Sequence, residues 1–292
     1  FNLNYVLSRT GVGFIYAAAL LYFNTKWRDH PVVRLSSYKI NNVTIIGVCL
    51  SLVFTTIYSI RDRATDQGYS DSLCQLELWS LTLGFTLGFG SLFAKTYRVH
   101  RLFNSKKLRL KSIHDWFLFS IVGAMILLDL ILLGVWQDRD PLRWQPVSEL
   151  AKSANGERVR WMQYSCTSTH RSLFMMLLCA EKGCILLYGA YLAFRVRDVA
   201  VAELNDSKWI GVSIYNVTAL FLLMSPVFFL QNSVNRVVAL AVLGLSTLVM
   251  AYLVLSLLFL PKIWAVYCSG SGSEDTSLGR GSNQVVPLII AD

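Results

Sequence analysis

Long apolar segments separated by short polar ones dominate the chain. Seven of them are close to the ~20 apolar residues that an α-helix needs to cross the hydrocarbon core of a bilayer. They are residues 4–24, 41–60, 73–94, 115–136, 172–194, 209–230 and 237–260. Backbone amides without hydrogen-bond partners are too costly in hydrocarbon, so all seven segments are predicted to be helical. The pattern therefore predicts an all-α membrane protein, a bundle of seven transmembrane helices.

We expect these helices to form one domain over residues 1–262, followed by a tail over residues 263–292. The tail contains the stretch SGSGSEDTSLGRGSN, whose Gly and Ser content is typical of disordered linkers. The sequence begins at Phe1 without an initiator methionine or a recognisable signal peptide, so we expect a fragment of a longer protein.

The composition supports a membrane protein and argues against a soluble one. Of the 292 residues, 54% are hydrophobic and 15% are charged, whereas soluble domains carry about 25% charged residues. The net charge of +9 could indicate a nucleic-acid partner, but the basic residues gather in the short segments between apolar ones. That distribution is typical of cytoplasmic loops facing an anionic leaflet, so no nucleic-acid partner is expected.

Basic residues also predict the orientation. Loops one, three and five are rich in Lys and Arg, whereas the long loop between the fourth and fifth segments dilutes its basic residues with acidic ones. The positive-inside rule then places the N-terminus outside the cell and the tail in the cytoplasm.

Two of the six cysteines lie at positions that favour a disulfide. Cys74 opens the third segment and Cys166 ends the fourth loop, so both face the oxidising side in this topology. We expect a Cys74–Cys166 disulfide; the alternative is two free thiols.

Ionisable side chains within the apolar segments need an explanation, because each costs about 2.5–3.5 kcal/mol in the hydrocarbon core on insertion scales. Glu77 lies one helical turn from Cys74, and Lys182 lies within the fifth segment. We expect Glu77 and Lys182 to form a buried ion pair between the third and fifth helices. The alternative is that Lys182 pairs with its neighbour Glu181 or reaches water in a cavity. Asp129 in the fourth segment is assigned no role beyond packing.

Several stretches resemble the transmembrane domain of class C G-protein-coupled receptors, specifically the metabotropic GABA (GABA-B) receptor subunits. They are SSYKINNVTIIG at 36–47, FAKTYRVHRLF at 93–103, DPLRW at 140–144, LNDSKWIGVSIYNV at 204–217 and FLPK at 259–262. The resemblance covers nearly all of residues 10–265 and looks closest to the second subunit of the family. The third segment ends without a DRY-type motif, which argues against the rhodopsin-like class.

This resemblance implies a multi-pass receptor of the plasma membrane that transmits a signal rather than binding the agonist. Its implied partners are a heterotrimeric G protein of the inhibitory type, a second class C receptor subunit and membrane lipid. The bilobed extracellular domain that binds GABA in such receptors is expected to precede Phe1, and the coiled coil that helps to pair such subunits is not seen in this sequence.

The resemblance also implies an ionic lock. Lys95 lies where the third helix is expected to meet the cytoplasm and Asp206 lies where the sixth begins, and class C receptors are similar to one another in having such a pair. An exposed ion pair contributes only about 0–1 kcal/mol. When two conformations of a receptor have nearly equal free energies, a contribution of this size is enough to shift their populations. The alternative is an interfacial Lys95 beside a helix-capping Asp206 whose local partner is Lys208.

A basic collar follows Lys95. It consists of Arg98, His100, Arg101, Lys106, Lys107, Arg109 and Lys111. Attraction to anionic lipid explains such a run at about 1 kcal/mol per charge. Docking of a G-protein α subunit is the sharper and compatible hypothesis.

Small and helix-breaking residues suggest packing and motion. Gly84 and Gly88 form a GxxxG pattern, which lets a neighbouring helix approach closely. Pro226 marks an expected kink and pivot in the sixth helix. Tyr215 and Asn216 are candidates for contact with a partner subunit, with core packing as the alternative.

No catalytic chemistry is expected. The four histidines lack the spacing of a metal site, and no phosphate-binding loop or nucleophile elbow is visible. We therefore predict no enzyme activity, no metal and no cofactor. The alternative functions are an orphan class C homodimer and, from another class, a membrane transporter with Glu77 and Lys182 as its midplane site, although internal repeats are not seen.

Overall fold

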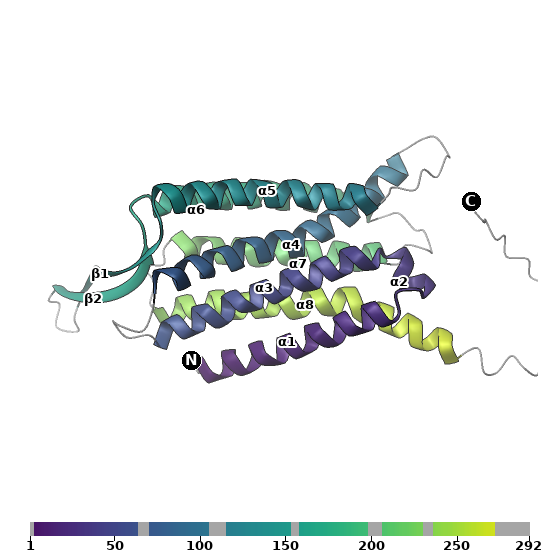
Figure 1. Ribbon diagram of the computed structural model, residues 1–292, viewed down its shortest axis with the longest axis horizontal. Coiled ribbons are helices and arrows are strands. Elements are labelled where there is room, and N and C mark those ends of the chain that lie inside the picture. The colour runs from purple at the N-terminus through teal and green to yellow at the C-terminus, as the bar shows by residue number, and fades with distance from the viewer. Residues whose placement is uncertain are drawn as a thin grey trace, which may run out of the picture.

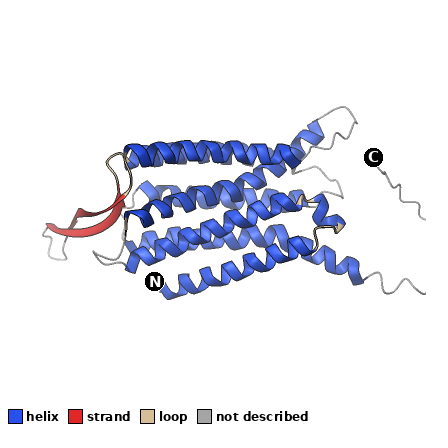
Figure 2. Ribbon diagram, viewed as in Figure 1, coloured by secondary structure: helices blue, strands red, loops and turns tan. Residues whose placement is uncertain are grey.

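The computed structural model describes residues 3–63, 70–104, 115–152, 158–197, 206–229 and 236–271. In these residues seven long helices lie side by side as one bundle, with a short helix and a β-hairpin outside it (Figures 1 and 2). The helices are α1 (Leu3–Lys26), α2 (Pro31–Leu35), α3 (Tyr38–Arg63), α4 (Asp71–Asn104), α5 (Asp115–Arg139), α6 (Arg171–Val196), α7 (Asp206–Phe229) and α8 (Arg236–Ser271); the strands are β1 (Arg143–Lys152) and β2 (Arg158–Thr167).

The predicted seven-helix bundle is confirmed. Among the described helices, all but the five-residue α2 are long and apolar enough to cross a membrane. The last helix, α8, continues through Ser271, past the predicted domain boundary at residue 262. Residues 272–292 of the predicted tail lie outside the described residues.

The bundle has two distinct ends. We call them the hairpin end, where β1 and β2 project, and the α2 end, where α2 caps the opposite side (Figure 1). The first helix begins near the hairpin end and α8 ends beyond α2. The hairpin was not predicted from the sequence, which suggested only a long loop between the fourth and fifth spans.

The hairpin is tied to the bundle at its base. The two strands are antiparallel, and Trp144 pairs with Cys166 across the ladder. The backbone amide of Trp144 donates a 2.7 Å hydrogen bond to Asp71 at the start of α4. A two-stranded ribbon alone is marginally stable, so such anchors are what allow it to form here.

The closest helix packing is between α3 and α4. A Cβ atom on Gly47 would lie 2.2 Å from the backbone nitrogen of Gly88, and one on Gly84 would lie 2.8 Å from that of Ser51. Gly47 and Gly84 therefore bring these two backbones into contact, whereas a Cβ on Gly88 would meet nothing within 4 Å, so the contact needs only the first glycine of the GxxxG pattern. Gly47 on the facing helix completes the contact.

Candidate functional site

Charged side chains and their polar partners form three groups at different depths of the bundle. The hairpin-end pair consists of Arg61 and Glu77. The mid-bundle cluster consists of Thr86, Asp129, Glu181 and Lys182. The α2-end cluster consists of Asn24, Ser36, Ser37, Asn41, Lys95, Arg98 and Asp115.

At the hairpin end, the disulfide and an ion pair hold α3, α4 and the hairpin together. Cys74 of α4 is bonded to Cys166 of β2, which confirms the predicted disulfide. One turn deeper, Arg61 Nη1 donates to both carboxylate oxygens of Glu77, at 2.8 and 3.1 Å. Both side chains are about nine-tenths buried, and the Arg61 guanidinium also lies over the Tyr58 ring.

Glu77 therefore does not pair with Lys182, and that prediction was wrong. Lys182 Nζ contacts Asp129 Oδ1 of α5 and donates a 2.7 Å hydrogen bond to Thr86 Oγ1 of α4. Its amine also lies 2.9 Å from Glu181 Oε2, as the alternative for Lys182 stated. Asp129, assigned no role from the sequence, is the principal counter-ion of Lys182.

The sequence did contain a signal for this pairing. Asp129 lies well inside its span, where a charge is costly without a partner. Depth along each helix, rather than chain order, selects the pair. Glu77 is nine residues before Thr86, so at ~1.5 Å per residue it lies about 13 Å away along α4.

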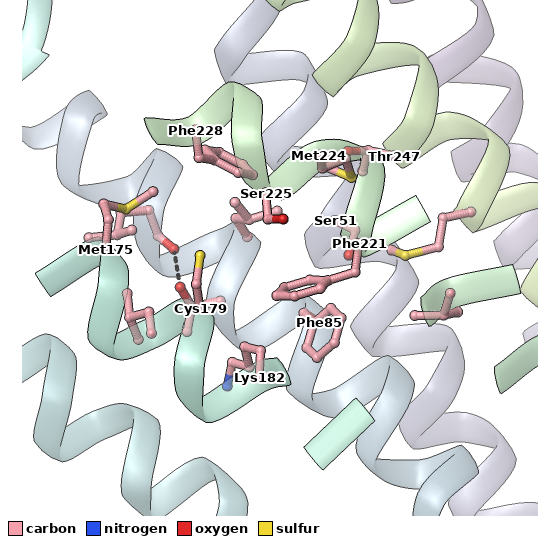
Figure 3. Close-up of a pocket in the computed structure, with 16 residues that line it drawn as sticks. Ser51, Phe85, Met175, Cys179, Lys182, Phe221, Met224, Ser225, Phe228 and Thr247 are labelled. Carbon is pink, nitrogen blue, oxygen red and sulfur yellow. Dashed lines mark hydrogen bonds between the residues drawn. The ribbon is translucent and has the colours of Figure 1, made fainter. Parts of the chain in front are cut away.

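An apolar cavity lies beside the mid-bundle cluster, between α3, α4, α6, α7 and α8. Its wall includes Phe85, Met175, Phe221 and Met224, and Lys182 lies at one side of it (Figure 3). Lys182 thus lines the apolar cavity and also contacts the carboxylate of Asp129.

At the α2 end, Lys95 is buried with only 2% of its surface exposed. Its amine contacts Asn41 Oδ1 of α3 and lies 3.5 Å from Ser36 Oγ beside α2. Asn41 in turn donates to Asn24 of α1 at 3.2 Å. The chain of contacts joins α1, α3 and α4 at one end of the bundle.

A second set of contacts fixes the loop between α2 and α3. Arg98 Nη1 donates a 2.6 Å hydrogen bond to Ser37 Oγ, which itself donates to Asp115 Oδ1 at 2.9 Å. Arg98 and Asp115 also form an ion pair at 3.7 Å. Ser37 has a left-handed backbone, with φ of 56°, which costs free energy for a residue other than glycine and is retained here by these two partners.

The remaining predicted site residues are only partly tested by the geometry. The side chain of Asp206 lies outside the described residues, as do Lys106, Lys107, Arg109 and Lys111. The ionic lock and most of the basic collar therefore stay predictions. Within the described part of the collar, His100 is half-buried and the Arg101 guanidinium lies 5.1 Å from the centre of the Phe117 ring.

The α7 residues are placed but their role is untested. Tyr215 is 42% exposed on the bundle surface, and Pro226 lies inside the helix. Asn216 donates to the carbonyl of Val212 one turn earlier, so its amide is used within its own helix. Among the residues that the structure describes, no three His, Cys, Asp or Glu side chains gather as metal ligands.

Comparison with known proteins extends across nearly the whole bundle. Residues 5–262 match the family described as "7 transmembrane sweet-taste receptor of 3 GCPR". The chain is 36% identical over 262 residues to gamma-aminobutyric acid type B receptor subunit 2 of Homo sapiens, covering 87% of this chain and 27% of the relative. It is 32% identical over 272 residues to subunit 2 of Caenorhabditis elegans, covering 92% of this chain and 32% of the relative. Identity to subunit 1 of Rattus norvegicus is 28% over 274 residues, covering 91% of this chain and 28% of the relative.

Proposed function

The chain belongs to the class C family of seven-transmembrane G-protein-coupled receptors, and from this membership we propose that it is the membrane domain of a GABA-B-type transducing subunit. Such a family member is a multi-pass protein of the plasma membrane. In this proposal, ligand binding by a region outside residues 1–292 is passed through the bundle to an inhibitory heterotrimeric G protein. The chain spans 27–32% of the length of the relatives compared above. The activity of a whole receptor is therefore part of the proposal.

The observation that carries the proposal is the higher identity to subunit 2 than to subunit 1. Identity is 36% to the human subunit 2 and 28% to the rat subunit 1, each over most of this chain. The resemblance implies that the second subunit transmits the signal while another subunit binds the agonist. We therefore expect this protein to work beside a second class C subunit.

The α2 end is the proposed G-protein face. Lys95 is held there by neutral amide and hydroxyl groups of Asn41 and Ser36. In the proposal, the Lys95 amine exchanges between these contacts and the carboxylate of Asp206, which gives the receptor two states. The orientation that puts this end in the cytoplasm follows from the positive-inside rule and is part of the proposal.

The test is reconstitution of signalling in cells. The full-length protein that contains this chain is expressed with a GABA-B receptor subunit 1, and activation of an inhibitory Gα is followed by energy transfer after GABA is added. We expect activation only when both proteins are present. Activation by the chain's own protein alone would favour a homodimer, and ion-coupled uptake without G-protein activation would favour a transporter.

The basic collar offers a sharper variant of the same experiment. Lys106→Ala with Lys107→Ala should reduce coupling more than surface expression. The matched control is Arg158→Ala with Arg160→Ala in β2, which removes the same charge at the other end of the bundle. Equal losses of coupling and expression in the Lys106/Lys107 variant would support lipid anchoring instead.

A further inference from the structure

We propose that the mid-bundle cluster is a proton-binding site in which Glu181 holds an exchangeable proton at neutral pH. This site does not depend on the proposed receptor function, because it follows from the buried charges themselves. The argument rests on the depth of the cluster, the number of its charges and the partners of each oxygen.

The cluster lies at the middle of the membrane-spanning segments. Thr86 is midway along the span of α4 from Asp71 to Arg101, and Lys182 is near the middle of α6. Asp129 of α5 is fully buried and the side chain of Lys182 is 7% exposed. At this depth an uncompensated charge is expensive, because neither water nor lipid headgroups solvate it.

The charges of the cluster do not balance if every group is in its usual form. Asp129 and Glu181 would carry two negative charges and Lys182 one positive charge, which leaves one negative charge in the hydrocarbon region. The charged groups that face Glu181 are Lys182 of its own helix and Asp129 of α5. From α4 the cluster receives the hydroxyl of Thr86, and the α7 residues lining the adjoining cavity, such as Phe221, are uncharged.

Asp129 has the environment of a carboxylate. Its Oδ1 contacts the Lys182 amine, and its Oδ2 accepts a hydrogen bond from the Thr86 hydroxyl. Thr86 Oγ1 also accepts from Lys182 at 2.7 Å, so the three groups form a closed ring of hydrogen bonds. A carboxylate that accepts at both oxygens, one of them from an ammonium, is stabilised in its charged form.

Glu181 has the environment of a neutral acid. Its side chain is only 9% exposed, and neither of its oxygens makes a hydrogen bond of good geometry among the described residues, although Lys182 and Asp129 both lie close enough to act on it. Oε2 lies 2.9 Å from Lys182 Nζ, without the alignment that a hydrogen bond requires, and Oε1 contacts no donor. Protonation removes the excess negative charge and is the least costly state of such a group.

A proton fits this site better than a sodium ion. A metal cation would have to bind beside the Lys182 ammonium, which repels it, and Asp129 already uses both of its oxygens. A proton needs only one oxygen of Glu181 and leaves the ring of Asp129, Thr86 and Lys182 unchanged.

The proton has a consequence for the bundle. The folded protein binds one more proton than the unfolded chain at neutral pH, so its stability falls as the pH rises until Glu181 is deprotonated. Loss of the proton places a second carboxylate near Asp129 and weakens the junction of α4, α5 and α6. The site thereby makes helix packing sensitive to protons that reach the middle of the membrane.

Infrared spectroscopy of the full chain in lipid nanodiscs tests the site directly. A protonated carboxylic acid has a C=O stretch that a carboxylate lacks. We expect wild-type protein to show this band at neutral pH and to lose it as the pH is made alkaline. Glu181→Gln should lack the pH-sensitive band, whereas Glu77→Gln, a change at the buried glutamate of the hairpin-end pair, should keep it.

Thermal unfolding supplies the second measurement. The melting temperature of the wild type should decrease from neutral to alkaline pH, and that of Glu181→Gln should decrease less. Replacing sodium by N-methylglucamine should change neither the band nor the melting temperature. Absence of the band in folded wild-type protein would overturn the proposal, as would its persistence in Glu181→Gln. A missing band together with stabilisation by sodium alone would identify a sodium site in its place.

Discussion

The partner of each buried charged side chain in this bundle is determined by the depth at which the side chain lies. Lys182 pairs with Asp129 because both lie midway through their helices, while Glu77 lies near a helix end beside Arg61. A long side chain reaches only a few ångströms along the membrane normal, so it is limited to partners at its own level. Each charged residue in a span is therefore best interpreted together with those of equal depth.

The Arg61–Glu77 pair gives a prediction at this scale. Arg61→Met should destabilise the protein by on the order of 1–3 kcal/mol, because it removes a charged hydrogen bond to a buried carboxylate. The cost is limited by Arg171, whose charge also acts on this site. A double-mutant cycle with Glu77→Met, measured by thermal unfolding in detergent, should show a favourable coupling between Arg61 and Glu77. Additive effects of the two single changes would contradict the pairing.

Asn41 gives a second prediction. Its amide oxygen contacts the Lys95 amine, whereas its neighbour Asn42 accepts a hydrogen bond from Asn24. If Lys95 restrains the resting receptor, Asn41→Ala should change basal G-protein signalling and Asn42→Ala should change it less. The measurement is agonist-free signalling in cells, normalised to surface expression. Equal basal signalling in wild type, Asn41→Ala and Lys95→Ala would remove the basis for the lock.

At the scale of elements, the contact between α3 and α4 is the tightest in the bundle. Gly47→Ala should destabilise the protein by about 1–3 kcal/mol, because its Cβ would meet the backbone of Gly88. Gly88→Ala is the matched control, since nothing lies within 4 Å of a Cβ built there. We expect a lower melting temperature only for the first variant. Equal effects would mean that the two helices are farther apart than described.

We expect the stability of the start of α6 to depend on pH through Asp140. Its carboxylate accepts hydrogen bonds from the backbone amides of His170 and Thr169, and these lower the pKa of Asp140 despite some desolvation. A lowered carboxyl pKa stabilises the fold above the usual value for aspartate, and this stabilisation is lost as the pH falls through the lowered value. Asp140→Asn should therefore reduce the melting temperature at neutral pH and weaken its decrease in acid. A wild-type acid profile unchanged by the substitution would contradict this role.

At the scale of the whole molecule, the orientation in the membrane is the property on which the receptor proposal depends. An epitope inserted between residues 105 and 114 should be inaccessible to antibody on intact cells and accessible after permeabilisation. The matched insertion between residues 153 and 157, in the connection of β1 to β2, should be accessible on intact cells. The reverse result would invert the topology and remove the α2 end as a G-protein face.

The seven spans and the disulfide could be predicted from the sequence because both follow from local composition. Hydrocarbon forces each apolar segment of about 20 residues to be a helix, whatever its neighbours are. The positions of Cys74 and Cys166 relative to those spans then placed both at the same end. The order of residues along the chain is therefore enough to predict the seven helices and the disulfide.

The partners of the buried charges, the hairpin and the contact of Gly47 with Gly88 were decided only by the tertiary structure. Each depends on the rotation and depth of one helix relative to another, and apolar helix surfaces in lipid leave many such arrangements close in free energy. Asp129 shows the consequence. Its place in the sequence marks it as costly, but only the packing of α4, α5 and α6 brings Thr86 and Lys182 to it and leaves Glu181 beside them without a hydrogen bond.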